Sequence, residues 1–519
     1  RPTRAMPDRP AVGGARVAAG PLPGWMRLPL AVLAGVVIGL GQPPYDLWYL
    51  GFAGYVAAVW LFLVTPGGLR SAGTGWAVGL GYFGFSMGWI VEPFFVDAAV
   101  TGWMAPFALI GLAGGLALFW GLAFRLSSQG RYPVIGLVLA WSLAELARAY
   151  VLTGFPWALV PYVWLPVPVI QWVSVIGPHG LTVMTLSAAA LCALALRPGG
   201  GRAALGAVAL LAVLFGGGWL LTPAAQDLAA RPVVRLVQPN APQHEKWDPQ
   251  KIPVFMQRKL EFTRAAPAEG RAAPALVVWP ETSVPNLLHR AGPTLDRITE
   301  AAGESRVLLG VQRADQAGYY NSLIVLAPGG GVQALYDKHH LVPFGEYMPA
   351  AALFARWNIA GLAARAEGGY TPGPGPQVID MGPLGSALPL ICYEAVFPQD
   401  VNGAPLRPDM LIQITNDAWF GTWSGPFQHL AQARIRSIEQ GLPMLRAANT
   451  GVSAVIDGAG RVLASIPLGE AGYVDAPLPP PIRHTIYSRS GDFPVGLLMF
   501  VAIAVLSAAS RRRSDTDSD

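Results

Sequence analysis

A series of long apolar runs opens the 519-residue chain, and one more lies close to its C-terminus. The eight runs cover residues 24–41, 48–65, 72–91, 100–125, 133–151, 168–196, 203–222 and 493–509. Most of them approach the ~20 residues that an α-helix needs to cross a bilayer. The pattern predicts a membrane protein with an eight-helix transmembrane domain, seven helices before residue 223 and one after it.

The charges between the runs predict the orientation of the chain. Arginines lie before the first run and in every second loop: Arg1, Arg4, Arg9, Arg16, Arg70, Arg125, Arg131, Arg197 and Arg202. The opposite loops carry Asp46, Glu92 and Asp97. Because cytoplasmic loops are enriched in Lys and Arg, the N-terminus is expected in the cytoplasm. Seven crossings then place residue 223 onward outside the cytoplasm, and three arginines after the last run, at 511–513, agree with this.

Residues 223–490 have a different pattern. Short apolar runs typical of buried strands recur at 233–237, 275–279, 307–311, 323–327, 387–391, 411–415 and 454–456, with helical patterns at 249–265, 293–302 and 428–440. This alternation predicts a layered α/β domain. The expected organisation is a cytoplasmic tail (1–23), a seven-span transmembrane domain (24–222), the α/β domain (223–490), and an eighth transmembrane helix with a short cytoplasmic tail (491–519).

Composition supports the membrane assignment. Hydrophobic residues make up 53% of the chain and charged residues only 13%, against roughly 25% in a soluble domain. The net charge of +5 is explained by arginines at the ends of apolar runs, so nucleic acid is not an expected partner. Of the two cysteines, Cys192 lies in a predicted membrane helix as a packing residue, which excludes a disulfide framework.

Three strand-like runs end at reactive side chains, namely Glu281, Lys338 and Cys392. A thiol is a weak nucleophile until it loses its proton, so it needs a base or a positive field. Glu281 is a candidate base, and Lys338 is a candidate donor to the oxyanion that forms when a thiolate attacks a carbonyl. The backbone N–H of Tyr393 is the second candidate donor. Each residue alone has an ordinary structural explanation, but their order at three strand ends is more specific.

Three motifs carry a family resemblance: Trp279-Pro280-Glu281, the stretch YDKHHLVPFGEY at 336–347, and Ile391-Cys392-Tyr393-Glu394. The set resembles the nitrilase superfamily. Together with the seven preceding runs and the one following, the chain is similar to the apolipoprotein N-acyltransferases of bacterial inner membranes. The resemblance implies a nitrilase-like αββα sandwich, an α/β fold, mounted on the helical membrane domain.

The resemblance also implies the roles of individual residues. Glu281 would be the base, Lys338 the oxyanion stabiliser and Cys392 the nucleophile, with Glu346 as a second, supporting carboxylate. Further residues would shape the site or contact substrate: Asn321, Tyr393, Glu394 and Trp247. No cofactor is implied. The neighbouring His339 and His340 are not joined by a further His or Cys cluster in the sequence, so no metal is expected.

The implied reaction has two half-reactions. Cys392 attacks an ester of a phospholipid and forms a thioester, and the N-terminal amine of a diacylglyceryl-cysteine lipoprotein then takes the acyl chain. A thioester suits this task because it reacts with amines and survives if water is kept away. The expected partners are a phospholipid donor, a lipoprotein acceptor and the bilayer. The expected location is the bacterial inner membrane, with the catalytic domain in the periplasm.

Two apolar segments near the motifs have both a functional and a structural interpretation. Residues 350–364, which include Phe354 and Trp357, have the spacing of an amphipathic helix. It is either a lid that dips into the bilayer surface and admits acyl chains or a helix that faces the core. Trp419 and Phe420 follow a strand, and they either line the site and contact lipid or belong to the core.

Two other functions fit parts of the pattern. A membrane-tethered amidase of the nitrilase type would hydrolyse a small C–N substrate, although such a substrate does not need the apolar segment at 350–364. A transporter or lipid-binding scaffold with an inactive nitrilase-like domain is the third possibility. The presence of Glu281, Lys338 and Cys392 together speaks against that third function.

Overall fold

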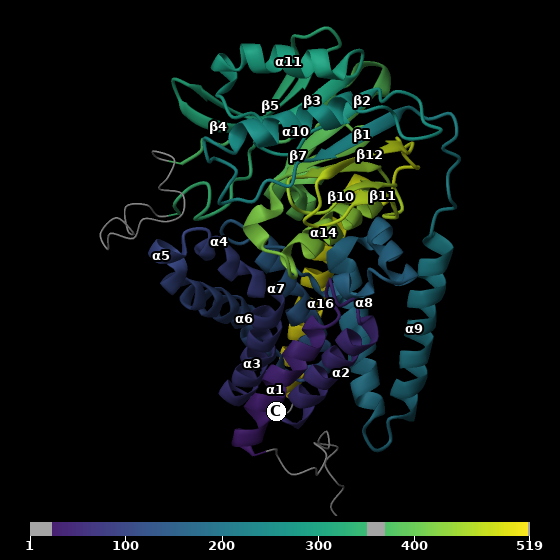
Figure 1. Ribbon diagram of the computed structural model, residues 1–519. Helices are drawn as coiled ribbons and strands as arrows, with labels where there is room; N and C mark the ends of the chain where they lie inside the picture. The colour runs from purple at the N-terminus through teal and green to yellow at the C-terminus, as the bar shows by residue number, and fades with distance from the viewer. Residues whose placement is uncertain (1–22, 350–368, 517–519) are drawn as a thin grey trace, which may run out of the picture.

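The molecule consists of a helical half and a β-sheet half, one stacked on the other. This computed structural model describes residues 23–349 and 369–516. In Figure 1 the long helices fill the lower half and the strands fill the upper half. The segment at 350–364, with Phe354 and Trp357, lies outside the described residues.

Within residues 23–349 and 369–516, the helical half contains eight long helices, one at each predicted apolar run. They are α1 (Gly24–Gly39), α2 (Trp48–Val64), α3 (Leu69–Ser86), α6 (Ala105–Gln129), α7 (Pro133–Tyr150), α8 (Val173–Ala195), α9 (Gly201–Leu221) and α16 (Phe493–Thr516). Short helices lie between them on the side of the sheets: η1 (Gly88–Val91), α4 (Glu92–Phe95), α5 (Ala98–Thr101), η3 (Val160–Trp164) and η4 (Pro168–Trp172).

The number of helices that meet the usual requirements for a span is smaller than the predicted eight. Within the described residues, four are both long and apolar enough, at Ala98–Gln129, Pro133–Tyr150, Pro168–Ala195 and Gly201–Leu221. Helices α1 and α2 have 16 and 17 residues, which at 1.5 Å per residue reach only about 24–26 Å of a hydrocarbon core of about 30 Å. Five glycines and an arginine lower the hydropathy of α3.

The ends of alternate helices face the sheets. Gln428, from the upper half, donates hydrogen bonds to Pro43 O and Ser86 O, just after α1 and at the end of α3. Gln399 Nε2 donates to Ala149 O near the end of α7, and Arg461 donates to Pro223 O after α9. The chain therefore passes through the helical half an odd number of times before it enters the first strand.

The outer surface of the helical half is apolar. Large hydrophobic side chains such as Leu118, Leu205 and Phe500 are more than half exposed. Monomeric soluble proteins rarely expose apolar surface on this scale, so the surface is expected to face lipid. In the interior, Glu145 and Arg148 form a fully buried ion pair of 2.6 Å, which satisfies two charges that lipid would not tolerate.

The upper half is a sandwich of two six-stranded sheets (Figure 1). The first sheet has the order β12 (Gly472–Pro477), β1 (Val233–Gln238), β2 (Leu276–Val278), β3 (Arg306–Asp315), β4 (Gly318–Leu326) and β5 (Val332–Asp337). The second has the order β11 (Val462–Ile466), β10 (Ser453–Ile456), β9 (Met444–Ala448), β8 (Met410–Thr415), β7 (Ser386–Ile391) and β6 (Ile379–Asp380). The central strands β1–β2–β3 and β7–β8–β9 are parallel, as an alternating α/β pattern predicts.

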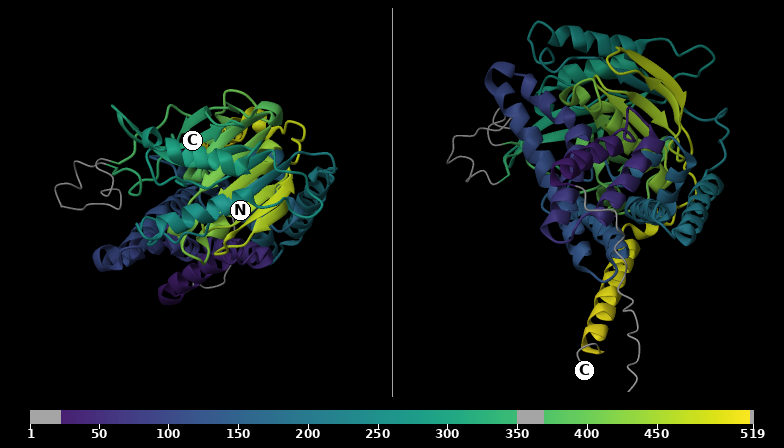
Figure 2. Two further views of the ribbon diagram at one scale, coloured as in Figure 1. Left: turned by 45° about the horizontal axis from the view of Figure 1, so that its top comes forward. Right: turned by 90° about the horizontal axis from the view of Figure 1, so that it is seen from below.

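Helices cover both outer faces of the sandwich, which gives the αββα layering. Helices α10 (Ile252–Arg264) and α11 (Gly292–Ala302) pack on the first sheet, and α14 (Gly425–Gln440) packs on the second. The two views in Figure 2 show this arrangement from other sides. Most of α14 is buried because its far side, at Ile435 and Ile438, joins the apolar core of the helical half. The helix therefore connects the second sheet to the membrane domain.

Candidate active site

The three candidate catalytic residues each follow a strand, as the sequence predicts. Glu281 comes after β2 and Lys338 after β5 of the first sheet, whereas Cys392 comes after β7 of the second sheet. All three side chains are buried, with at most 6% of each residue exposed. The structure thus brings a carboxylate, an ammonium and a thiol together between the two sheets.

Cys392 stands at a sharp turn between β7 and the short helix η8 (Cys392–Val396). Its φ of 53° lies in the left-handed region, which a residue with a Cβ rarely adopts and which is concentrated at functional sites. The turn is held by Glu394, whose Oε2 accepts a hydrogen bond of 2.7 Å from Ile391 N. Gln413 Nε2 donates to the Cys392 carbonyl oxygen at 3.1 Å and fixes the turn from the other side.

Glu281 is fixed by two hydrogen-bond donors. Asn321 Nδ2 donates to Oε1 at 2.7 Å, and the backbone N–H of Asn416 donates to Oε2 at 2.8 Å. The backbone at Glu281 lies against Gly310 of β3, where a Cβ would be 2.7 Å from the Glu281 Cα, so this position requires glycine. Burial raises the pKa of the Glu281 carboxyl, and the nearby Lys338 charge opposes the rise. A base with a raised pKa is better matched to a thiol.

Lys338 lies between two carboxylates. Its Nζ is 2.8 Å from Glu346 Oε2 and 3.9 Å from Glu281 Oε1. Burial favours the neutral amine, but the charges of Glu346 and Glu281 outweigh burial and hold the pKa of Lys338 above its ordinary value. Glu346 is itself fixed by Val342 N at 2.8 Å and by Asn321 Nδ2 at 3.1 Å. Lys338 is therefore a permanently charged donor, as an oxyanion stabiliser must be.

The surroundings keep the thiol neutral at rest. Burial, followed by the neighbouring Glu281 charge, raises the pKa of Cys392, whereas Lys338 and a hydrogen bond with Thr415 act in the opposite direction. The proton must therefore leave during the attack, because a free thiolate is not the resting state. This requires a base close to the thiol, and Glu281 is the carboxylate that interacts with it most strongly.

Tyr393 and Glu394 lie directly after Cys392 and are both buried. Glu394 Oε1 accepts hydrogen bonds from Tyr336 OH and from His339 N, both at 2.8 Å, so it ties the Lys338 segment to the Cys392 turn. The Tyr393 ring packs edge-on against Phe397, with 4.9 Å between centroids. These contacts position the turn and its backbone N–H groups.

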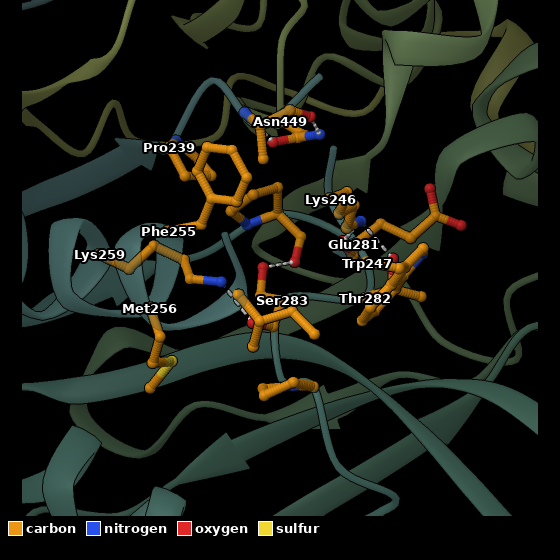
Figure 3. A pocket seen from close by; sticks show the side chains of 14 residues that line it. Pro239, Lys246, Trp247, Phe255, Met256, Lys259, Glu281, Thr282, Ser283 and Asn449 are labelled. Atoms are coloured by element: carbon orange, nitrogen blue, oxygen red, sulfur yellow. Dashed lines mark hydrogen bonds between the residues drawn. The ribbon is translucent and has the colours of Figure 1, made fainter. Parts of the chain in front are cut away.

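Trp247 lies at the edge of a small pocket behind Glu281 (Figure 3). Its side chain is 41% exposed, and Lys246 Nζ lies 5.3 Å from the centre of its ring. Lys246 also donates to Thr282 Oγ1 at 2.6 Å and to Glu281 O at 3.2 Å. The pocket has a volume of ≈ 20 Å³, which is room for about one water molecule and not for a substrate.

Two lysines that line this pocket, Lys246 and Lys259, were not among the site residues predicted from the sequence. Burial lowers the pKa of Lys246 to about 8, although Glu281 opposes the shift, and burial together with Lys246 lowers the pKa of Lys259 to about 7. Figure 3 shows Lys259 reaching toward Ser283. Both lysines hold the backbone of the segment after Glu281, where Thr282 has a φ of 45°.

The two predicted lipid-contacting aromatic residues have different surroundings. Trp419, in the short helix η9 (Asp417–Phe420), is half-buried. Phe420 packs against Trp89 and Trp157 of the helical half, with ring centroids 4.8 and 5.5 Å apart. This placement favours the packing interpretation for Phe420.

A buried polar cluster beneath Cys392 was not anticipated from the sequence. His429 Nδ1 lies 2.8 Å from Asp417 Oδ1, and Arg446 forms an ion pair of 2.5 Å with Asp417 Oδ2. Although burial acts in the opposite direction, Arg446 and His429 lower the pKa of Asp417 to about 2. Gln413 joins this cluster to the Cys392 carbonyl. The available signal was a polar residue inside an apolar strand, at Gln413 in β8 and Arg446 in β9.

Comparisons with known proteins agree with both halves of the molecule. The carbon-nitrogen hydrolase family model matches residues 234–486, which is the sandwich. The model of the apolipoprotein N-acyltransferase N-terminal domain matches residues 34–191, which is the helical half up to α8.

Relatives match along nearly the whole chain. The apolipoprotein N-acyltransferase of Brucella suis biovar 1 is 35% identical over 95% of this chain and 98% of that protein. Those of Bradyrhizobium diazoefficiens and Caulobacter vibrioides are each 38% identical over 94% of this chain, and over 96% and 95% of their own lengths. The chain therefore belongs to the apolipoprotein N-acyltransferase family.

Proposed function

We propose that this protein transfers an acyl chain from a phospholipid, through a thioester on Cys392, to the N-terminal amine of a diacylglyceryl-cysteine lipoprotein. The observation that carries the proposal is the Glu281–Lys338 pair beside the strained turn at Cys392, on a sandwich that packs directly on apolar helices. This arrangement presents a buried nucleophile close to a surface that faces lipid.

In the first half-reaction, Glu281 takes the proton of the Cys392 thiol as sulfur attacks the ester carbonyl. The oxyanion that forms is stabilised by Lys338 Nζ and by the backbone N–H of Tyr393. When the tetrahedral intermediate collapses, the C–O bond of the ester breaks, and Glu281 returns its proton to the leaving alkoxide. The products are an acyl thioester on Cys392 and a lysophospholipid.

In the second half-reaction, the free amine of the lipoprotein attacks the thioester carbonyl. Glu281 takes a proton from the attacking amine, and the same two donors stabilise the oxyanion. The C–S bond then breaks and the proton passes to the thiolate, which restores Cys392. The product is an amide, and no cofactor is needed because the reaction is an acyl transfer without a change in oxidation state.

Glu346 and Asn321 act as positioning residues in this account. Asn321 bonds both Glu281 and Glu346, and Glu346 bonds Lys338. The four groups form one network, so the base and the oxyanion donor keep a fixed separation. Such preorganisation matters because an electrostatic donor contributes only if it already points at the charge that develops.

The bilayer is part of the proposal. We place the protein in a bacterial inner membrane with the sandwich on the periplasmic side, since the arginine-bearing loops lie on the other side of the helical half. Residues 24–222 and 491–519 would hold the enzyme in the membrane, and residues 223–490 would carry the chemistry. The apolar outer face of the helices then lies in the same leaflet as the donor lipid.

An amidase acting on a small substrate is the competing function. The sandwich alone is compatible with it, because carbon-nitrogen hydrolases share this fold. However, the match to the N-terminal acyltransferase domain covers most of the helical half, and an enzyme for a small polar substrate has no use for that half.

A transfer assay distinguishes the two functions. The purified full-length protein is mixed with phospholipid and a diacylglyceryl peptide, and the products are quantified by mass spectrometry. We expect triacylated peptide and lysophospholipid in equal amounts, and no product from Cys392→Ala. Free fatty acid without acylated peptide, or hydrolysis of small amides at a comparable rate, would contradict acyl transfer.

A further inference from the structure

A second cavity lies at the junction between the helical half and the sandwich. It has a volume of ≈ 280 Å³ and is open to solvent, unlike the small pocket behind Glu281. One wall is helix α4, with Glu92 and Phe95, and the opposite walls are the segments after β1 and β8. Figure 1 shows α4 at the upper end of the helical half, directly below the sandwich.

The wall of this cavity is joined to the catalytic base by two hydrogen bonds. Gln243, which lines the cavity, accepts a hydrogen bond of 2.7 Å from Asn416 Nδ2. The backbone N–H of the same Asn416 donates to Glu281 Oε2 at 2.8 Å. Asn449 braces this connection, because its Nδ2 donates to Asn416 Oδ1 and to Ala241 O. A ligand in the cavity therefore lies close to the reacting groups.

The lining suits a peptide that carries a positive charge. Its polar side chains are amides and hydroxyls, among them Asn240, Gln243, Thr422 and Thr450, which pair well with backbone N–H and C=O groups. Among the described residues that line the cavity there is one carboxylate, Glu92, and no lysine or arginine. A phosphate head group would find only the exposed imidazole of His244 here, whereas an ammonium group would find the carboxylate of Glu92.

Glu92 is held against the sandwich by a glycine. A Cβ at Gly421, whose φ is 66°, would lie 2.5 Å from the Glu92 Cδ, so only glycine lets the carboxylate lie there. The backbone N–H of Glu92 donates to Trp89 O, but its carboxylate has no hydrogen-bond or ion-pair partner among the described residues. Its side chain is half-buried at the cavity wall, which leaves its oxygens available to a ligand.

The cavity lies at the height of the membrane surface. Phe95 at the end of α4, Trp103 between α5 and α6, and Phe107 in the first turn of α6 are each more than half exposed. Aromatic side chains of this kind gather where bilayer and water meet. If the two acyl chains of a lipoprotein remain in the bilayer, its peptide begins at this boundary between bilayer and water.

We propose that this cavity binds the peptide residues that follow the cysteine of the lipoprotein acceptor, with Glu92 as the counter-charge for a basic side chain among them. The proposal rests on the proposed function, since it assigns the acceptor of the same reaction to a site.

The test compares two acceptors with the purified full-length enzyme in lipid nanodiscs. One is diacylglyceryl-cysteine amide, and the other carries four further residues after the cysteine. The variants are Thr422→Trp, which fills the cavity from its rim, and Glu92→Gln, which removes its charge. The control variants are Glu300→Trp and Glu300→Gln, at an exposed position of α11 far from the junction.

We expect the wild-type enzyme to prefer the longer acceptor, and Thr422→Trp to lose about fivefold to tenfold in kcat/KM for that acceptor alone. Glu92→Gln lowers kcat/KM for the longer acceptor by a smaller factor, and both variants form the acyl-enzyme from phospholipid at the wild-type rate.

Equal use of the two acceptors by the wild-type enzyme would overturn the proposal and leave the proposed function intact. Slower acyl-enzyme formation in Thr422→Trp would also overturn it, because the cavity would then belong to the donor lipid. A wild-type enzyme that acylates neither acceptor would defeat the proposed function as well.

Discussion

At the scale of single residues, the proposed mechanism depends on a thiol whose pKa is raised and a carboxylate that would take its proton. Burial raises the pKa of both Cys392 and Glu281, because a medium of low dielectric disfavours the thiolate and the carboxylate, which are the charged forms. The raised pKa of Glu281 makes its carboxylate a stronger base, and the raised pKa of Cys392 means that its proton leaves only as sulfur attacks. Lys338 supplies the positive charge that makes the transient anion tolerable.

The raised pKa of Glu281 predicts the pH dependence of acylation. The base must be ionised, so the rate of acyl-enzyme formation falls as pH drops through the Glu281 pKa, which lies above the ordinary 4.5. Glu281→Gln removes the base and lowers this rate by about 10²–10⁴-fold. The measurement is a pH profile of single-turnover acylation, with Glu300→Gln as the control. A Glu281→Gln variant that keeps the wild-type rate of acylation and its fall at low pH would show that another group is the base.

The residues that the sequence predicted are those with a local motif. Glu281, Lys338 and Cys392 each end an apolar strand, and the structure places them between the same two sheets. His429, Asp417 and Arg446 had no such marker as a group, because they come from a helix, a turn and a strand that meet only in the folded molecule. A pattern along one chain records strand ends well, but it does not record contacts between distant elements.

At the scale of elements, α14 and the strands β8 and β9 support the Cys392 turn. Arg446 of β9 satisfies Asp417, which contacts His429 of α14. Trp157 of the helical half stacks on the His429 ring with 5.7 Å between centroids, so the cluster also contacts the membrane domain. Strand β9 was missed in the sequence because its five residues, MLRAA, have an arginine at the centre and two alanines after it, whereas the apolar residues on both sides of Gln413 in β8 are large and branched.

Removing Arg446 should destabilise this group of elements. Arg446→Met leaves the buried Asp417 carboxylate with His429 and Thr415 but without its arginine, and breaking a buried ion pair typically lowers stability by about 3–5 kcal/mol. The double variant Arg446→Met with Asp417→Asn removes both charges and should recover part of that loss. The thermal unfolding midpoints of the two variants in detergent provide the measurement. If the double variant is no more stable than Arg446→Met, the buried charge of Asp417 is not the cause.

At the scale of the whole molecule, the apolar core of the helical half extends into the sandwich, which also has apolar clusters of its own. Val396 and Phe397 after the nucleophile, and Ile435 of α14, belong to the same cluster as the membrane helices. The active site is therefore built on the membrane domain and not tethered to it by a linker. The sequence predicted where the eight long helices lie, but helices α1, α2 and α3 are too short or too polar to be counted as spans on their own.

The orientation of the whole molecule can be tested by labelling single cysteines. In a background with Cys192→Ser and Cys392→Ala, a cysteine is introduced either at the exposed Glu300 of the sandwich or at the exposed Arg131 between α6 and α7. An impermeant thiol reagent added to cells with a permeabilised outer membrane should label Glu300→Cys at once. Arg131→Cys should react only after the inner membrane is broken. The reverse result would place the sandwich in the cytoplasm.

The most direct test of the mechanism is the mass of the intact protein after incubation with phospholipid alone. We predict one added acyl chain, located on Cys392 by peptide mapping, released by hydroxylamine and by a diacylglyceryl peptide, and absent from Cys392→Ala. An active enzyme without this adduct, or with an acyl chain that hydroxylamine does not release, would contradict transfer through a thioester.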